Sequence, residues 1–285
     1  THSVRTGVMD SMLIFFWVCA IALFEQRKRH ASFSYAAGLC IGLGVLTKSV
    51  HGFVPLVIIA GYLLLTKQSA EFKTAPFWGM VGLSLLLPSF WYLPHFFGNA
   101  EFFQIAVKQQ IFDRVQGKIH HPHIHGPFFF VQAIYSGFFP WSLLAVPALG
   151  IGCWLAIKNK RHALTLLLIW IVSVFLGFSV SKMKVVWYMN PLYPAFALLI
   201  AASGVWGYRH FKGHARYPLI APLIVMIFAG CAATSLAANY SRVSERVEKL
   251  PLHVFSDYLL RAKLDDYRVV FYRMSIADFD YADRY

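Results

Sequence analysis

The stretch SYAAGLCIGLGVLTKSVHGFVPLVIIAGYLLLT, residues 34–66, decides how the chain is threaded. It holds two apolar runs, 34–46 and 52–66, which are separated by the polar interruption 47–51. Each run is shorter than the ~20 residues with which a helix crosses the ~30 Å hydrocarbon core of a bilayer. The stretch is therefore either one bent helix or two short spans joined by a turn.

The composition of the 285 residues indicates a bilayer setting for the whole chain. Hydrophobic residues make up 58% of it and charged residues only 14%, with a mean hydropathy of +0.56. Soluble domains usually carry about 25% charged residues. This composition excludes a disordered chain, a collagen-like repeat and a disulfide-rich secreted module.

Loop charge distinguishes the two models for residues 34–66. If the stretch forms two spans, the loops 25–33, 67–73, 158–162 and 208–216 all lie on one side and together hold eleven Lys and Arg residues. Short loops rich in Lys and Arg stay in the cytoplasm, so the two-span model is favoured. The predicted spans are then 12–24, 34–46, 52–66, 77–93, 128–157, 163–180, 185–206 and 217–238.

We therefore predict an all-α integral membrane protein, a polytopic helix bundle of about eight spans. Its transmembrane domain covers residues 1–238 and includes an extracytoplasmic juxtamembrane helix and loop at 94–127. A small α/β appendage, 239–285, follows on the same side. The run 128–157 is too long for one span and contains Pro140, so we expect it to begin as an interfacial segment.

The positive charge of the chain belongs to the membrane part. The formal net charge is +13; residues 1–238 hold 18 Lys and Arg against 5 acids, whereas 239–285 hold 8 of each. On a membrane protein this pattern predicts contact with anionic lipid headgroups and not with nucleic acid.

Asp10 is the leading candidate for acid–base chemistry on the outer face. Of the five acids in the membrane part, Glu25 and Glu71 fall in basic cytoplasmic loops, which leaves Asp10, Glu101 and Asp113. Asp10 immediately precedes a span, where a carboxylate is costly unless it is paired or functional. The alternative is that Asp10 simply caps the helix that follows.

Four cations lie at span ends on the side where the positive-inside rule disfavours them. Together they could neutralise a phosphate through charge-assisted hydrogen bonds. The alternative for each is ordinary snorkelling to lipid headgroups. The four are Arg5, Lys48, Lys182 and Lys184.

A histidine tract, HHPHIH at 120–125, lies in the long outer loop. Histidine-rich tracts bind metals, but this one contains no Cys and no regular i, i+4 spacing. It is either a metal site, with His123 and His125 as candidate ligands, or a loop that lines a cavity.

Taken in order, four short segments resemble the GT-C membrane glycosyltransferases, in particular the bacterial branch similar to the lipid A aminoarabinose transferase and the protein O-mannosyltransferases. The likeness spans roughly residues 1–206, and Ser49 stands where that family usually has Gly. The segments are RTGVMD at 5–10, GLGVLTKS at 42–49, HGPFFF at 125–130 with PWS at 140–142, and SVSKMK at 179–184 with YMNPLYP at 188–194.

The resemblance implies an inverting transferase that moves a sugar from a polyprenyl-phosphate donor to a lipid (lipid A-like) or protein acceptor. The expected setting is the bacterial inner membrane, with the active site facing the periplasm. Asp10 would act on the acceptor, and the four cations would contact the donor phosphate. No cofactor is required, although the resemblance allows a divalent metal at His125 or His123.

The resemblance also implies a longer protein. The family's first catalytic Asp follows its first span, and no counterpart precedes Asp10 here. We therefore expect this chain to lack N-terminal spans and to be inactive alone.

Two other functions remain open from the sequence. A transporter or flippase of lipid-linked substrates would commonly show inverted repeats and polar sites near the bilayer midplane. The spans here carry almost no charge at mid-membrane and no internal repeat. A structural subunit that binds a partner through 239–285 is the third possibility.

Overall fold

The computed structural model describes residues 9–99, 125–182, 184–212 and 225–238, together with the single positions 102, 104, 105, 108, 222 and 240. Every element formed by these residues is helical, as the composition predicted. The chain divides into two compact units, Thr1–Ala221 and Pro222–Tyr285. Helix Val225–Ala238 falls in the second unit, and the predicted domain boundary after residue 238 stays a prediction. The predicted α/β appendage lies outside the described residues, apart from Tyr240.

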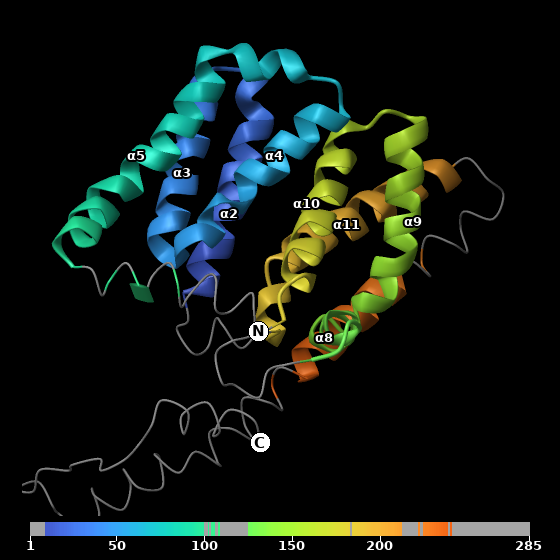
Figure 1. The fold of residues 1–285 in the computed structure, drawn as a ribbon. Coiled ribbons are helices and arrows are strands. Elements are labelled where there is room, and N and C mark those ends of the chain that lie inside the picture. The colour runs from blue at the N-terminus through green and yellow to red at the C-terminus, as the bar shows by residue number, and fades with distance from the viewer. Residues whose placement is uncertain are drawn as a thin grey trace, which may run out of the picture. The chain divides into compact units, whose positions relative to one another are not determined.

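The first group of helices surrounds α3 (Ser32–Lys48), which packs between α2 (Asp10–Glu25) and α5 (Ala75–Gly98). Figure 1 shows the three helices side by side. They are apolar on nearly all sides, which is typical of helices in a bilayer. A Cβ on Gly38 would lie 2.4 Å from the carbonyl oxygen of Met80, so this glycine permits the close approach of α3 and α5.

The chain reverses between α3 and α4 (Val54–Leu65). This reversal lies within residues 34–66, the stretch that could form either one bent helix or two short spans. Ser49 has a φ of 49°, which ends α3, and a 3-10 turn, η2 (Ser49–Phe53), follows. A Cβ on Gly52 would lie 2.1 Å from the backbone nitrogen of Val45. In one straight helix these residues would be about 10 Å apart along the axis. The two runs are therefore separate helices that meet at one end (Figure 1).

The second group comprises α8 (Phe129–Gly137), α9 (Ser142–Lys158), α10 (His162–Ser179) and α11 (Leu192–Phe211). Helices α8 and α9 meet at 111°, with Pro140 in the break. This bend confirms that the run 128–157 is not one straight span. Helix α10 packs against α9, α11 and α4, and so joins the two groups.

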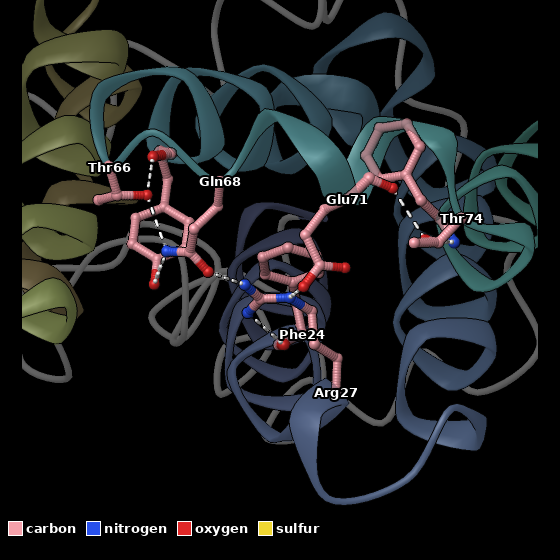
Figure 2. Close-up of polar contacts among 8 residues, drawn as sticks. Phe24, Arg27, Thr66, Gln68, Glu71 and Thr74 are labelled. Carbon is pink, nitrogen blue, oxygen red and sulfur yellow. Dashed lines mark hydrogen bonds and ion pairs between the residues drawn. The ribbon is translucent and has the colours of Figure 1, made fainter.

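Three helix connections meet at one end of the first unit, which we call the basic end. Arg27, just after α2, pairs with Glu71 in the connection between α4 and α5 (Figure 2). The Tyr62 ring near the end of α4 meets the His162 ring at the start of α10 edge-on, with centroids 6.5 Å apart. These contacts bring together three of the four loops that the charge argument placed on one side, 25–33, 67–73 and 158–162. The cations of this end are Arg27, Lys28, Arg29, Lys67, Lys73, Lys158, Lys160, Arg161, Arg209 and Lys212.

Three helical stretches of the described residues are long and apolar enough to cross a membrane: Ser32–Leu65, Ala75–Gly98 and His162–Ser179. The bent pair α8 and α9 would make a fourth. The first of these stretches, Ser32–Leu65, contains the reversal between α3 and α4 and is therefore two helices. The count of eight spans stays a prediction.

Candidate active site

Asp10 and Lys48 meet at the end of the helices opposite the basic end. Asp10 is the first residue of α2 and Lys48 is the last residue of α3, and the Lys48 ammonium pairs with Asp10 Oδ1. The Asp10 side chain is 6% exposed and that of Lys48 is 26% exposed. We call this region the Asp10 end.

The ion pair excludes two of the alternatives considered for these residues. The residue that precedes α2 is Met9, and no side chain caps the helix, so the prediction that Asp10 might be a helix cap is wrong. Lys48 does not extend to the headgroups as a snorkelling side chain would, because its ammonium is bound to a carboxylate inside the bundle.

The second carboxylate oxygen of Asp10 is unsatisfied in the part of the chain that the structure describes. Oδ2 is buried and has no hydrogen-bond partner there. Leaving a buried acceptor unpaired costs about 1–3 kcal/mol, and native proteins seldom do so without a reason. Oδ2 therefore offers an unused acceptor to a hydroxyl group once the side chains that cover it move aside.

An aromatic cluster lies beside the ion pair. His51 of η2 stacks on Phe178 at the end of α10, with ring centroids 5.5 Å apart, and Phe178 stacks on Tyr188 at 4.8 Å. Tyr188 belongs to the 3-10 turn η5 (Val186–Met189), and its ring centroid lies 5.9 Å from the Lys48 ammonium. Segments that are distant in the sequence thus converge on Lys48.

We did not select His51 and Tyr188 from the sequence. A signal existed for each of them. His51 lies three residues after Lys48 in the polar interruption between two apolar runs, and Tyr188 opens the quoted segment YMNPLYP. We interpreted the first position as part of a connection between spans and the second as part of the family resemblance. Nothing in the local sequence indicates that both rings lie close to Lys48.

Lys184 is a buried cation at this end, whereas Lys48 is partly exposed. Lys184 is 7% exposed, and its ammonium donates to the backbone carbonyl of His125 at 3.4 Å. Burial excludes snorkelling for Lys184. Lys182 is exposed on the same connection, between α10 and η5. Arg5 lies outside the described residues.

His125 stacks on Phe129, with ring centroids 4.0 Å apart and an interplanar angle of 6°. Among the residues that the structure describes, no three His, Cys, Asp or Glu side chains gather as metal ligands. His123, the other candidate ligand, lies outside the described residues. The described residues alone do not assemble a donor set for the divalent ion.

The geometry of the Asp10 end suits chemistry on a hydroxyl and an anion. A carboxylate oxygen free to accept a hydrogen bond can hold and take a hydroxyl proton. A partly exposed ammonium beside it can stabilise a developing negative charge in a site that largely excludes water. Both groups come from helix ends, so packing holds them in place.

The chain is similar in sequence to known membrane-lipid-linked sugar transferases by the names they carry. Residues 1–102 match the family model described as "Dolichyl-phosphate-mannose-protein mannosyltransferase". The chain is 32% identical over 222 residues to an undecaprenyl phosphate-alpha-4-amino-4-deoxy-L-arabinose arabinosyl transferase of Sodalis glossinidius, covering 70% of this chain and 36% of that protein. It is also 32% identical to an uncharacterized protein of Aquifex aeolicus over 180 residues, covering 62% of this chain and 34% of the relative.

The fold is similar to that of a protein of known structure. The crystal structure of ArnT from Cupriavidus metallidurans bound to undecaprenyl phosphate superposes with a TM-score of 0.61 at 20% identity, covering 78% of this chain and 40% of that one. The resemblance predicted from the motifs is thereby confirmed. The chain has the GT-C fold of an integral membrane protein, and it spans about a third of the length of the relatives that it matches.

Proposed function

We propose that this chain provides part of the active site of a membrane glycosyltransferase that takes its sugar from a polyprenyl-phosphate donor. The observation that carries the proposal is the buried Asp10–Lys48 pair, whose Oδ2 oxygen is left without a partner in the described residues. The names of the matched family model and of the Sodalis relative support the reaction class, since they describe a dolichyl-phosphate-mannose-protein mannosyltransferase and an undecaprenyl phosphate-aminoarabinose arabinosyl transferase.

In the proposed reaction an acceptor hydroxyl attacks the anomeric carbon of the donor sugar, and the bond from that carbon to the phosphate oxygen breaks with inversion. Asp10 Oδ2 accepts the hydrogen bond of the hydroxyl and receives its proton. The donor leaves as a polyprenyl monophosphate, and Lys48 stabilises its charge. Lys184, Lys182 and Arg5 add positive charge around the phosphate.

Membrane orientation follows from charge. We propose that the basic end faces the cytoplasm, because short loops rich in Lys and Arg stay on that side. The Asp10 end would then face the periplasm, across the inner membrane of a bacterium. The acceptor is a lipid, as for lipid A, or a protein.

The lysines of the Asp10 end also affect whether transfer needs a divalent metal ion. Because ammonium groups can neutralise the leaving phosphate, we propose that transfer needs no divalent ion. Treatment with EDTA then leaves the rate unchanged. A loss that added metal restores would instead indicate a metal site at His125 or His123.

The test is a transfer assay in membranes that carry the natural full-length protein, with radiolabelled polyprenyl-phosphate sugars and a cell-envelope lipid extract. We expect label to move into a lipid or protein acceptor, and this transfer to be lost in Asp10→Asn. Lys28→Gln is the matched control, because Lys28 is an exposed cation of the basic end.

Two results would overturn the proposal. Unchanged turnover in Asp10→Asn removes Asp10 from the mechanism. If no donor supports transfer and labelled lipid instead crosses the bilayer of reconstituted vesicles, the protein is a flippase.

A further inference from the structure

A hollow of about 570 Å³ lies along α11 at the basic end, away from the Asp10 end. Helix α10 has 18 residues and separates the two ends by about 27 Å. The hollow is lined by one stripe of α11 together with the residue that precedes α10. Its lining residues are Arg161, Leu198, Ala201, Ala202, Val205, Trp206, Arg209 and His210.

The hollow is amphipathic. Arg161 and Arg209 are exposed and line the part of the hollow that we call the rim, and none of the described residues that line the hollow is acidic. Neither arginine forms an ion pair with an acid in the described part of the chain. Its remaining length is apolar, with Leu198 and Val205 each 51% exposed. A ligand that fits must therefore carry an anionic head and an apolar tail.

The length of the lining stripe on α11 matches the thickness of one leaflet of a bilayer. Leu198 and Arg209 are eleven residues apart on α11, which is about 16 Å of helix. Half of the ~30 Å hydrocarbon core is about 15 Å. An acyl chain whose phosphate lies between the arginines would reach to the level of Leu198.

Aromatic rings mark the headgroup level beside the rim. Trp154 of α9 meets Trp206 edge-on at 5.5 Å, and Trp206 stacks on His210 at 5.0 Å. The Lys158 ammonium lies 4.9 Å from the Trp154 ring centroid. Tryptophan and lysine gather where the hydrocarbon gives way to the headgroups, so the rim lies at that level.

We infer that this hollow binds an anionic phospholipid of the membrane leaflet at the basic end, with its phosphate between Arg161 and Arg209 and an acyl chain along α11. The charge of the rim selects an anionic head over a zwitterionic one. The apolar stripe selects a lipid over a soluble phosphate. This inference does not depend on the proposed transferase reaction.

The test measures lipid retained by the purified protein, by native mass spectrometry in detergent, with phosphatidylglycerol and phosphatidylcholine of identical acyl chains. Each cation near an anionic surface contributes about fivefold in affinity, so Arg161→Gln with Arg209→Gln weakens phosphatidylglycerol retention about thirtyfold. The matched control is Lys28→Gln with Arg29→Gln, two exposed cations of the same end that do not line the hollow. This control keeps wild-type retention.

Ala201→Phe tests the shape of the site without changing its charge. Ala201 is exposed, so the bundle tolerates a larger side chain there, but the ring fills the hollow and lowers retention. Equal loss in both double variants would mean a general charge effect and would overturn the inference. So would equal retention of the two lipids, or displacement of bound lipid by inorganic phosphate.

Discussion

Among the described residues, each end of the bundle holds one ion pair with an enclosed partner, and the two pairs are built in opposite ways. At the basic end the cation is enclosed: the side chain of Arg27 is 4% exposed and that of Glu71 is 29% exposed. At the Asp10 end the anion is enclosed: Asp10 is 6% exposed and Lys48 is 26% exposed.

The pairs differ further in the kind of atom that is left without a hydrogen-bond partner. Arg27 donates to Gln68 Oε1 at 2.8 Å and to the Phe24 carbonyl at 3.2 Å, and its guanidinium lies 4.1 Å from the Phe24 ring centroid (Figure 2). Asp10 Oδ2 has no such partner in the described residues. The Arg27 pair therefore fastens two loops together, whereas the Asp10 pair retains an acceptor for a ligand. Within the described part of the chain, each pair contains a buried atom without a hydrogen-bond partner, Arg27 Nε in one and Asp10 Oδ2 in the other, and only the carboxylate oxygen can accept a hydroxyl proton.

The largest expected effect is on the rate of sugar transfer, and it distinguishes the Asp10 carboxylate from the Glu71 carboxylate. Asp10→Asn keeps the shape but lowers basicity, and we expect the rate to fall about 100-fold or more, as when a general base is removed. Glu71→Gln is the matched substitution and should leave the rate near that of the wild type. Initial rates in membranes measure both. Comparable losses in the two variants would show that the ends do not differ in function.

The next effect concerns the turn that positions Lys48. In Gly52→Ala the new methyl group meets the backbone of Gly44 and Val45, so η2 must move. We expect a loss of about 3 kcal/mol in the free energy of unfolding, together with lower transfer. Gly82→Ala is the control, because nothing lies within 4 Å of a Cβ there. Thermal unfolding in detergent compares them, and equal stability would mean that the turn is not tightly packed.

A smaller effect tests whether Asp10 depends on its cation. Lys48→Met leaves a buried carboxylate uncompensated, which costs about 2 kcal/mol here because Lys48 is partly exposed. Adding Asp10→Asn removes that charge and should restore stability but not transfer. Unfolding and activity are measured on the same preparations. If the second substitution restores nothing, the two side chains are not coupled.

The smallest effect is expected at the basic end. Glu71→Gln leaves Arg27 its bonds to Gln68 and Phe24, and Glu71 itself is partly solvated, so we expect a loss of about 1 kcal/mol or less. The melting temperature in detergent at low and high salt measures it. A loss larger than that of Lys48→Met would reverse the assignment of the two ends.

Much of this architecture could be predicted from the sequence. The apolar runs predicted helices close to α2, α3, α4, α5 and α10, because the length and hydrophobicity of a helix in a bilayer are local properties. The charge of four loops predicted the reversal inside residues 34–66. Asp10 and Lys48 were both singled out, each as a charge at an unfavourable place.

Only the tertiary structure decided how these charges are used. Asp10 and Lys48 are 38 residues apart, and their pairing depends on α2 and α3 being antiparallel and in register at that end. The burial of Lys184 and the ring cluster around Tyr188 likewise require packing between segments that are remote in sequence. A sequence pattern shows which residues avoid water. Whether a buried oxygen has a hydrogen-bond partner depends on the positions of all the atoms around it, and the packing of the folded chain sets these positions.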